Sequence, residues 1–211
     1  KILSQKRRSA AELLEKSSES DWRDLNMSQA RFKVDFQIKE DQQGVPYDSD
    51  RRVAYGPTGL EQVEFLIAPN PGEGFKPLVR IASGGETSRL MLAMKNVLAR
   101  ADQIQSLIFD EIDQGIGGRI GAVVGEKLWT LARQHQVFCI THLPQLAAFG
   151  DHHFHVQKHI DSGRTTTQVQ SLKGEQRLIE LAQMLGEVSE GTMHSAHELS
   201  DLVYKRTKGL S

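Results

Sequence analysis

The hydrophobic and polar positions of the first third of the chain change period, and each change marks an expected element. Residues 1–20 are rich in helix-forming residues with leucines roughly on one face, although fewer than three heptads are present and the pattern does not establish a coiled coil. Residues 30–39 alternate apolar and polar, and residues 60–68 begin the same way, which predicts an antiparallel pair of strands. Residues 40–59, rich in Asp, Gln, Gly and Pro, are expected to form a mobile loop between them.

A strand, helix, strand pattern occupies the centre of the chain. After the small-residue turn at residues 83–86, an apolar stripe at helical spacing runs from residue 90 to residue 98, and the short apolar run that begins at residue 106 predicts a buried strand. Residues 119–134 return to helical spacing, and residues 137–141 form the next apolar strand. This order predicts a parallel crossover, in which the residues that follow the two strands meet at one edge of the sheet.

The last third of the chain predicts a short helix, a hairpin and two closing helices. The short helix is expected at 143–149. Residues 152–159 and 165–172 alternate and are joined by a turn-forming segment, which is typical of a β-hairpin. Residues 174–186 and 192–207 return to helical spacing. The chain as a whole is therefore expected to be of the α/β class.

Composition narrows the class of protein without naming a function. A hydrophobic share of 38% and a charged share of 25% are those of a globular protein, and the apolar runs are too short for a membrane span. The formal charge of −1 predicts no overall nucleic-acid footprint, so any DNA contact is expected to be local. The single cysteine, Cys139, lies in an apolar strand pattern and is expected to be an inert thiol. We expect a cytoplasmic protein, and, because the chain begins without Met and in mid-pattern, a fragment.

The first candidate site is Ser83-Gly84-Gly85-Glu86, which opens the helix at 84–98. Helix N-termini carry unpaired N–H groups and the positive end of the helix dipole, and two glycines let an oxyanion approach that backbone. The plain alternative is an ordinary helix start, in which Ser83 caps the helix and Glu86 completes a capping box.

The second candidate site follows the two central strands. Asp110 and Glu111 end the first strand, and His142 stands just past the second, so the crossover brings all three to one sheet edge. Ligands of open α/β sheets bind at that edge. Taken alone, each feature has a plain explanation, an acidic strand end or a satisfied strand-end histidine. His152, His153 and His155 lack zinc-site spacing and are interpreted as strand surface.

Together these segments resemble the ATP-binding-cassette ATPases. Ser83–Glu86 looks like their signature motif and Ile108–Glu111 like their Walker B strand. Ile112-Asp113 looks like their D-loop, and Thr141-His142 like their switch histidine. The resemblance implies an ABC-type ATPase head lobe, with a parallel sheet core, helices and an antiparallel hairpin.

Hydrolysis of a nucleotide γ-phosphate needs a metal, a positioned water and partners for the departing charge. Asp110 suits Mg²⁺, which it would hold directly or through a water. Glu111 is expected to polarise the attacking water and His142 to donate to the γ-phosphate. Asp113, just beyond, is expected to order a dimer seam.

The chain contains no G-x-x-x-x-G-K-[ST] loop to cradle phosphates. This arrangement resembles the SMC-like ATPases, whose head is split by a coiled coil so that the P-loop lies in the first half. Within that group the chain is similar to the RecN family of bacterial DNA repair proteins over essentially its whole length. The resemblance is carried by residues 75–86, 109–118 and 140–148. Gln114 and one of Gly117 and Gly118 depart from that family's pattern, which has a small residue such as Thr and a Ser there.

The resemblance implies a mechanism and partners. Residues 1–25 would end a coiled-coil arm, and residues 26–211 would form the C-terminal head lobe, completed by an N-terminal P-loop half. Two such heads would sandwich ATP and Mg²⁺, with Ser83–Glu86 of one head acting in trans on the nucleotide of the other. The homodimer would act on DNA in double-strand-break repair by recombination, in the bacterial cytoplasm at the nucleoid and with no membrane contact.

Three other interpretations remain open. The chain would also suit the head of another SMC-like or RecF-like DNA-maintenance ATPase, although residues 143–147 favour RecN. It would suit a nucleotide-free dimerisation scaffold, although a scaffold needs neither Glu111 nor His142. A helicase-type Asp-Glu-x-Asp interpretation of residues 110–113 leaves Ser83–Glu86 unexplained.

Overall fold

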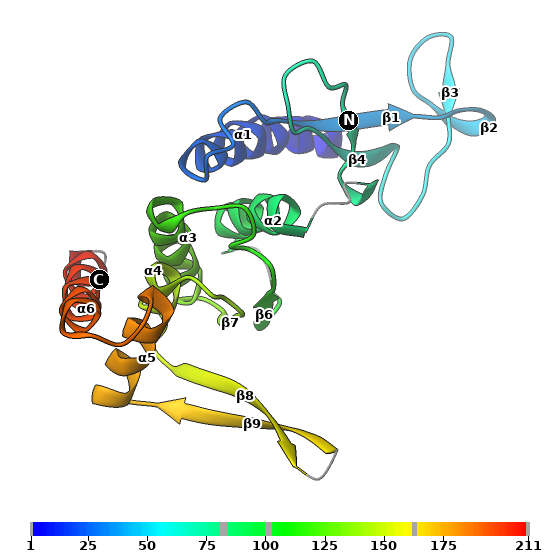
Figure 1. Ribbon diagram of the computed structural model, residues 1–211. Coiled ribbons are helices and arrows are strands. Elements are labelled where there is room, and N and C mark those ends of the chain that lie inside the picture. Colours follow the sequence, from blue (N-terminus) through cyan, green and yellow to red (C-terminus); the bar gives the residue numbers. More distant parts are fainter. Residues whose placement is uncertain (1, 81–83, 100–102, 162–163, 210–211) are drawn as a thin grey trace. The chain divides into compact units, whose positions relative to one another are not determined.

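The computed structural model describes residues 2–80, 84–99, 103–161 and 164–209, and divides the chain into two compact units, Lys1–Ser83 and Gly84–Ser211 (Figure 1). Each unit has its own internal packing. In order, the first unit contains α1 (Ile2–Asp24), β1 (Arg31–Ile38), β2 (Glu40–Pro46), β3 (Arg52–Val53), β4 (Glu61–Ala68), β5 (Lys76–Pro77) and the 3₁₀ turn η1 (Leu78–Arg80).

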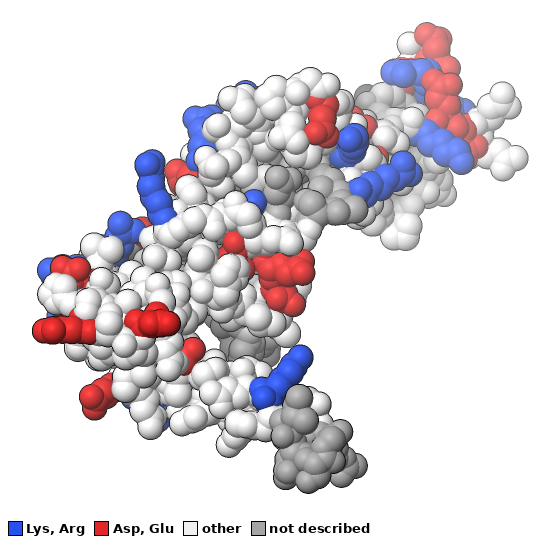
Figure 2. Space-filling view, viewed as in Figure 1, with Lys and Arg blue, Asp and Glu red and all other residues white. Residues whose placement is uncertain are grey.

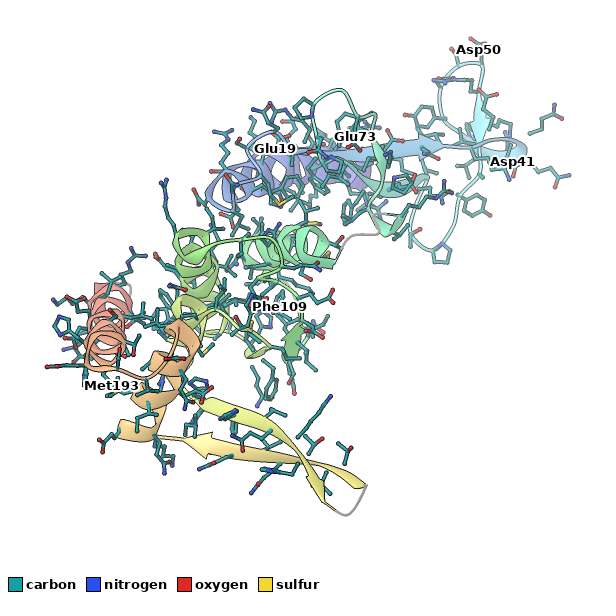
Figure 3. All side chains as sticks on the ribbon, in the orientation of Figure 1. Glu19, Asp41, Asp50, Glu73, Phe109 and Met193 are labelled. Atoms are coloured by element: carbon teal, nitrogen blue, oxygen red, sulfur yellow. The ribbon has the colours of Figure 1, made fainter. Side chains whose placement is uncertain are left out.

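The predicted antiparallel pair is confirmed. β1 pairs with β4 from Arg31 opposite Ala68 to Ile38 opposite Glu61, and β5 adds a short third strand. The intervening segment, for which composition predicts a mobile hairpin loop, contains paired strands, because β2 folds back on β3 as a small sheet of its own. Asp41 lies near the start of β2, and Asp50 lies in the turn that leads to β3 (Figure 3). The turn-forming residues of the segment serve the turn of a hairpin.

The first helix runs to Asp24, beyond the predicted end at residue 20, because Trp22 closes the core of this unit. Trp22 is fully buried and meets Phe32 of β1 edge to face, with ring centroids 5.8 Å apart. Helix α1 also covers the outer edge of β1: Glu15 accepts the Val34 N–H at 2.7 Å and Glu19 the Phe32 N–H at 3.1 Å. These carboxylates occupy donors that an exposed edge strand would offer to another chain.

The second unit contains the central crossover and the closing elements. Its elements are α2 (Gly84–Leu98), β6 (Ser106–Phe109), α3 (Gly118–Leu131), β7 (Gln136–Cys139), α4 (Pro144–Ala147), β8 (His153–Asp161), β9 (Arg164–Leu172), α5 (Glu175–Leu185) and α6 (Glu190–Gly209). Strands β6 and β7 are parallel, with Ser106 opposite Gln136 and Phe109 opposite Cys139, which confirms the predicted crossover. Strands β8 and β9 form the expected antiparallel hairpin.

The parallel pair has one buried and one exposed face. Phe109 of β6 is 7% exposed, and the helix α3 residues behind the sheet include the buried Val124 and Leu128. On the opposite face Ile108 is 73% exposed, and two β7-side residues, Phe138 and Ile140, are also exposed. Buried and exposed side chains therefore alternate along β6, as in a sheet covered on one face, although its apolar sequence predicts a strand buried on both faces.

A second apolar cluster joins α4, α5 and α6. Its buried members are Ala148, Phe149, Leu181, Ala182, Ala196 and Val203. No helix among the described residues has the length and apolar content that crossing a membrane requires. The predicted arm-to-lobe boundary after residue 25 concerns the role of α1 and stays a prediction.

Candidate active site

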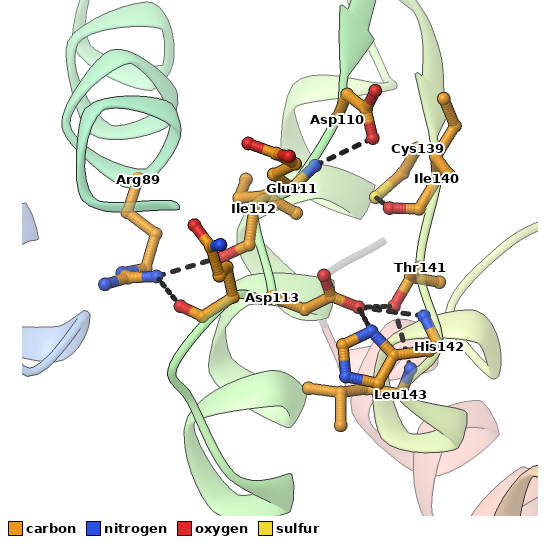
Figure 4. Close-up of polar contacts among 11 residues, drawn as sticks. Arg89, Asp110, Glu111, Ile112, Asp113, Cys139, Ile140, Thr141, His142 and Leu143 are labelled. Atoms are coloured by element: carbon orange, nitrogen blue, oxygen red, sulfur yellow. Dashed lines mark hydrogen bonds and ion pairs between the residues drawn. The ribbon is translucent and has the colours of Figure 1, made fainter. Parts of the chain in front are cut away.

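The first two acidic residues stand at the carboxyl end of β6. The Asp110 side chain accepts the backbone N–H of Glu111 at 2.9 Å, and both carboxylates are exposed (Figure 4). Glu111 has φ 56°, in the left-handed region that a non-glycine residue seldom adopts. The backbone turns sharply at Glu111, so neighbouring carboxylates leave the strand in different directions.

The third acidic residue, Asp113, is buried at 4% exposure and organises the end of the neighbouring strand. One of its oxygens accepts hydrogen bonds from the Thr141 hydroxyl and, at 2.9 Å, from the His142 backbone N–H. The same oxygen lies 3.1 Å from His142 Nδ1. The Thr141 hydroxyl oxygen in turn accepts the Leu143 N–H at 3.0 Å. Asp113 therefore ties the β6 loop to the β7 loop within one chain, a role that the sequence analysis did not anticipate.

The His142 ring is held through one nitrogen and is otherwise exposed to solvent. Its side chain is 76% exposed although Nδ1 rests on the buried Asp113. The predicted meeting of Asp110, Glu111 and His142 at one sheet edge is borne out by the parallel register of β6 and β7, and Asp113 supplies the link between the loops. The opposite ring nitrogen, Nε2, is the atom left to face a ligand.

The glycines at the start of α2 lie directly against the acidic loop of residues 110–114. A Cβ at Gly84 would collide with Glu111 Oε2, and one at Gly85 would come within 2.8 Å of the Gln114 carbonyl oxygen. The Gly85 N–H donates to Gln114 Oε1 at 3.2 Å. At Gly85 the neighbouring atoms include backbone oxygens of the loop, so this position favours glycine, whereas the atom nearest to Gly84 is the end of the flexible Glu111 side chain. Ser83 lies outside the described residues, and Glu86 is placed within the first turns of α2.

Two residues that sequence reasoning missed complete this contact. The Ser88 hydroxyl donates to the Asp110 carbonyl at 3.0 Å, and Arg89 Nη1 donates to the carbonyls of Ile112 and Gln114 at 3.2 and 2.9 Å. Arg89 is only 6% exposed. The available signal was an arginine inside an otherwise apolar helix stripe, because a buried guanidinium requires acceptors.

Magnesium fits this edge only with ligands from outside the chain. Among the described residues there is no group of three or more His, Cys, Asp or Glu side chains able to hold a metal ion. Asp110 is exposed and its Oδ1 accepts one backbone N–H, so its other oxygen is available. A single carboxylate with waters and phosphate oxygens is a coordination that Mg²⁺ accepts.

His153, His155 and Cys139 serve packing. The interpretation of His153 and His155 as strand surface is wrong: His155 Nδ1 lies 3.0 Å from Glu180 of α5, and the pKa of His153 is lowered by burial and by the nearby Arg177. Burial, reinforced by Asp113 and Asp110, raises the pKa of the Cys139 thiol to about 12, which agrees with the expected inert thiol.

On the face shown in Figure 2, basic and acidic side chains are interspersed.

The helix that begins at paired glycines, the acidic end of β6 and the histidine after β7 are arranged as the resemblance to ABC-type heads predicts. No family model matches the chain. It is 40% identical over 195 residues to the DNA repair protein RecN of Streptomyces coelicolor, covering 92% of this chain and 34% of that protein. It is 41% identical to RecN of Vibrio cholerae (90% and 32%) and 36% identical to RecN of Bacillus subtilis (93% and 35%). The chain is RecN-like, and it corresponds to the C-terminal part of that family, spanning about a third of the length of these relatives.

Solved SMC heads are more distant. A structure from work on ATP-driven dimerisation and DNA-stimulated activation of SMC ATPases aligns with a TM-score of 0.47 at 16% identity, covering 86% of this chain and 96% of that one. The Smc head of Pyrococcus yayanosii aligns with a TM-score of 0.49 at 20% identity, covering 84% and 29%. At these scores, the assignment to RecN rests on the sequence matches.

Proposed function

We propose that the chain is the C-terminal head lobe of a RecN-like ATPase that hydrolyses ATP with Mg²⁺ at a head–head interface. The complete protein would act in repair of DNA double-strand breaks by recombination, in the bacterial cytoplasm at the nucleoid. The observation that carries the proposal is the single edge at which Asp110, Glu111 and the Asp113-anchored His142 follow two parallel strands.

Each residue of this edge has a defined task in the proposal. Asp110 would hold Mg²⁺, which would neutralise charge on the β- and γ-phosphates. Glu111 would accept a proton from the attacking water, since its carboxylate is exposed and leaves the strand apart from that of Asp110. His142 would donate from its exposed ring to the γ-phosphate, with Asp113 fixing the ring through Nδ1.

The remaining parts of the site come from other polypeptide segments. An N-terminal P-loop half would supply the phosphate cradle, and the exposed apolar face of Ile108, Phe138 and Ile140 is the surface that we assign to it. A second head in a homodimer would present Ser83–Glu86 in trans to the nucleotide. Asp113 would lie at the seam between the heads, and DNA would be a partner of the complete protein.

The test is ATP turnover by the chain alone, and then by the complete protein with its P-loop half, with and without DNA. We expect no turnover by the chain alone and Mg²⁺-dependent turnover by the complete protein. Glu111→Gln in the complete protein should lower turnover about 1,000-fold, because the base is lost, and should trap ATP-bound dimers. Unchanged turnover in Glu111→Gln would contradict the assignment, and absence of turnover in the complete protein would favour a dimerisation scaffold.

A further inference from the structure

Several hydrogen bonds join α2 to the acidic loop (residues 110–114). Three donors from consecutive turns of α2 reach the loop: the Gly85 N–H, the Ser88 hydroxyl and the Arg89 guanidinium. Their acceptors are the Gln114 side chain and the carbonyls of alternate loop residues, 110, 112 and 114. The donors hold the loop at its start, its middle and its end.

Arg89 is the centre of this contact. It is 6% exposed, and its neighbours along α2, Leu90 and Leu92, are fully buried. Taking a guanidinium out of water costs several kcal/mol unless it is hydrogen-bonded, and an apolar side chain of similar length would fill the same space without that cost. The carbonyls of Ile112 and Gln114, to which Nη1 donates, are acceptors of the kind that a buried guanidinium requires (Figure 4).

The loop that Arg89 holds contains every acidic residue of the proposed site. Glu111 lies within it at φ 56°, a conformation that persists only where surrounding contacts enforce it. Asp113 lies between the two carbonyls that Arg89 holds, and it anchors His142. A shift of this loop would displace the base, the metal carboxylate and the histidine together.

We propose that Arg89 is a positioning residue that, with Ser88 and Gln114, ties the start of the signature helix to the catalytic loop of the same head. Through this tie the position of α2 sets the position of Glu111 and, through Asp113, that of His142. This inference rests on the proposed function, and it adds a link within one head between the residues that act in trans and those that act in cis.

The experiment compares Arg89→Met, Arg89→Lys and the control Arg133→Met in the complete protein. Arg133 is an exposed arginine of the same unit whose guanidinium lies over Trp129. Arg89→Met should lower kcat about 100-fold, the effect of a displacement of about 1 Å in catalytic groups, with the Kd for ATP unchanged. Arg89→Lys, whose ammonium can still donate to carbonyls, should recover much of that loss, and Arg133→Met should match wild type.

A double-mutant cycle separates positioning from plain structural support. Because part of the effect of Arg89 is exerted through Glu111, Arg89→Met should cause a smaller fold loss of residual turnover when Glu111 is already Gln than it causes in wild type. Equal fold losses in both backgrounds, or a wild-type kcat in a folded Arg89→Met protein, would overturn the inference. Should Arg89→Met not fold, the pair Ser88→Ala with Gln114→Ala loosens the same contact while leaving the buried guanidinium in place, and an unchanged kcat in that variant would overturn the proposed tie.

The outcomes also distinguish this inference from the proposed function. If wild type does not hydrolyse ATP, or Glu111→Gln leaves turnover intact, the proposed function has failed. If wild type turns over and Glu111→Gln does not, while the Arg89 and Ser88/Gln114 variants keep the wild-type kcat, only the positioning role has failed.

Discussion

Two histidine–carboxylate pairs in the second unit have nearly the same contact distance and opposite surroundings. His142 Nδ1 lies 3.1 Å from Asp113, and His155 Nδ1 lies 3.0 Å from Glu180. In the first pair the ring is 76% exposed and the carboxylate 4%; in the second both side chains are largely buried, at 28% and 16%. The distance between the partners therefore says nothing about their tasks.

The two pairs differ in how much of the histidine ring remains exposed for contact with a ligand. The buried Asp113 orients the exposed ring of His142 while leaving Nε2 at the surface, as a ligand-binding histidine requires. His155 is enclosed by the hairpin and α5, where its contact joins two elements. A histidine beside a carboxylate becomes a candidate for chemistry when the carboxylate is buried and the ring is not. The predictions below test this distinction.

The largest effect is expected at Asp113. Asp113→Asn replaces a carboxylate, one oxygen of which accepts from the Thr141 hydroxyl and the His142 N–H, with an amide whose oxygen accepts more weakly and whose nitrogen cannot accept. The free energy of unfolding should fall by about 2–3 kcal/mol, measured by urea denaturation of the chain. Asp201→Asn, at an exposed position of α6, should change it by less than about 0.5 kcal/mol. Equal effects would mean that Asp113 does not anchor the two loops.

The next effect separates the two histidines by activity. His142→Ala should lower turnover of the complete protein about 100-fold, because a γ-phosphate donor is lost, with little change in unfolding free energy. His155→Ala should leave turnover at the wild-type level and weaken the attachment of the hairpin, detected as faster hydrogen exchange in β8 and β9. A loss of turnover in both variants would erase the distinction between the pairs.

A smaller, pH-dependent effect is expected beside His155. The pKa of His153 is lowered from 6.5 by burial and by Arg177 and His155, against an opposing effect of Glu180. The unfolded state therefore binds the proton more readily, so this contribution to stability is full above pH 6.5 and is lost as the pH falls below it. Hydrogen-exchange protection of β8 should drop between about pH 7 and 5, and His153→Gln should flatten that drop. An identical drop in the variant would place the acid sensitivity elsewhere.

The smallest effect is expected at Cys139, next to the first pair. Its pKa is raised to about 12, so the folded state keeps the thiol protonated and stability is lost as the pH rises from about 9 toward 12. Alkylation by iodoacetamide at pH 8.5 should be slower in the native chain than in urea-unfolded chain. A native rate equal to the unfolded rate would show that burial does not protect this thiol.

Local patterns were sufficient for most of the secondary structure and for the chemical types at the site. The parallel crossover, both antiparallel pairs and the sheet edge shared by Asp110, Glu111 and His142 follow from hydrophobic period and from the handedness of crossovers. The small β2–β3 sheet was missed because turn-forming residues dominate its composition and its pairing is short. The surface interpretation of His155 failed because alternation gives the face of a residue and not what packs on that face.

What the sequence determined by itself is a set of residues whose types and spacing already specify a chemistry: glycines at a helix start, carboxylates at one strand end and a histidine at the next. What only the tertiary structure decided is which of these residues touch. Asp113 became an internal anchor, Glu111 lies against Gly84, and Arg89 reaches the carbonyls of Ile112 and Gln114. The physical reason is that spacing within an element is set by local backbone geometry, whereas contacts between α2 and a loop more than twenty residues away depend on packing that no local period records.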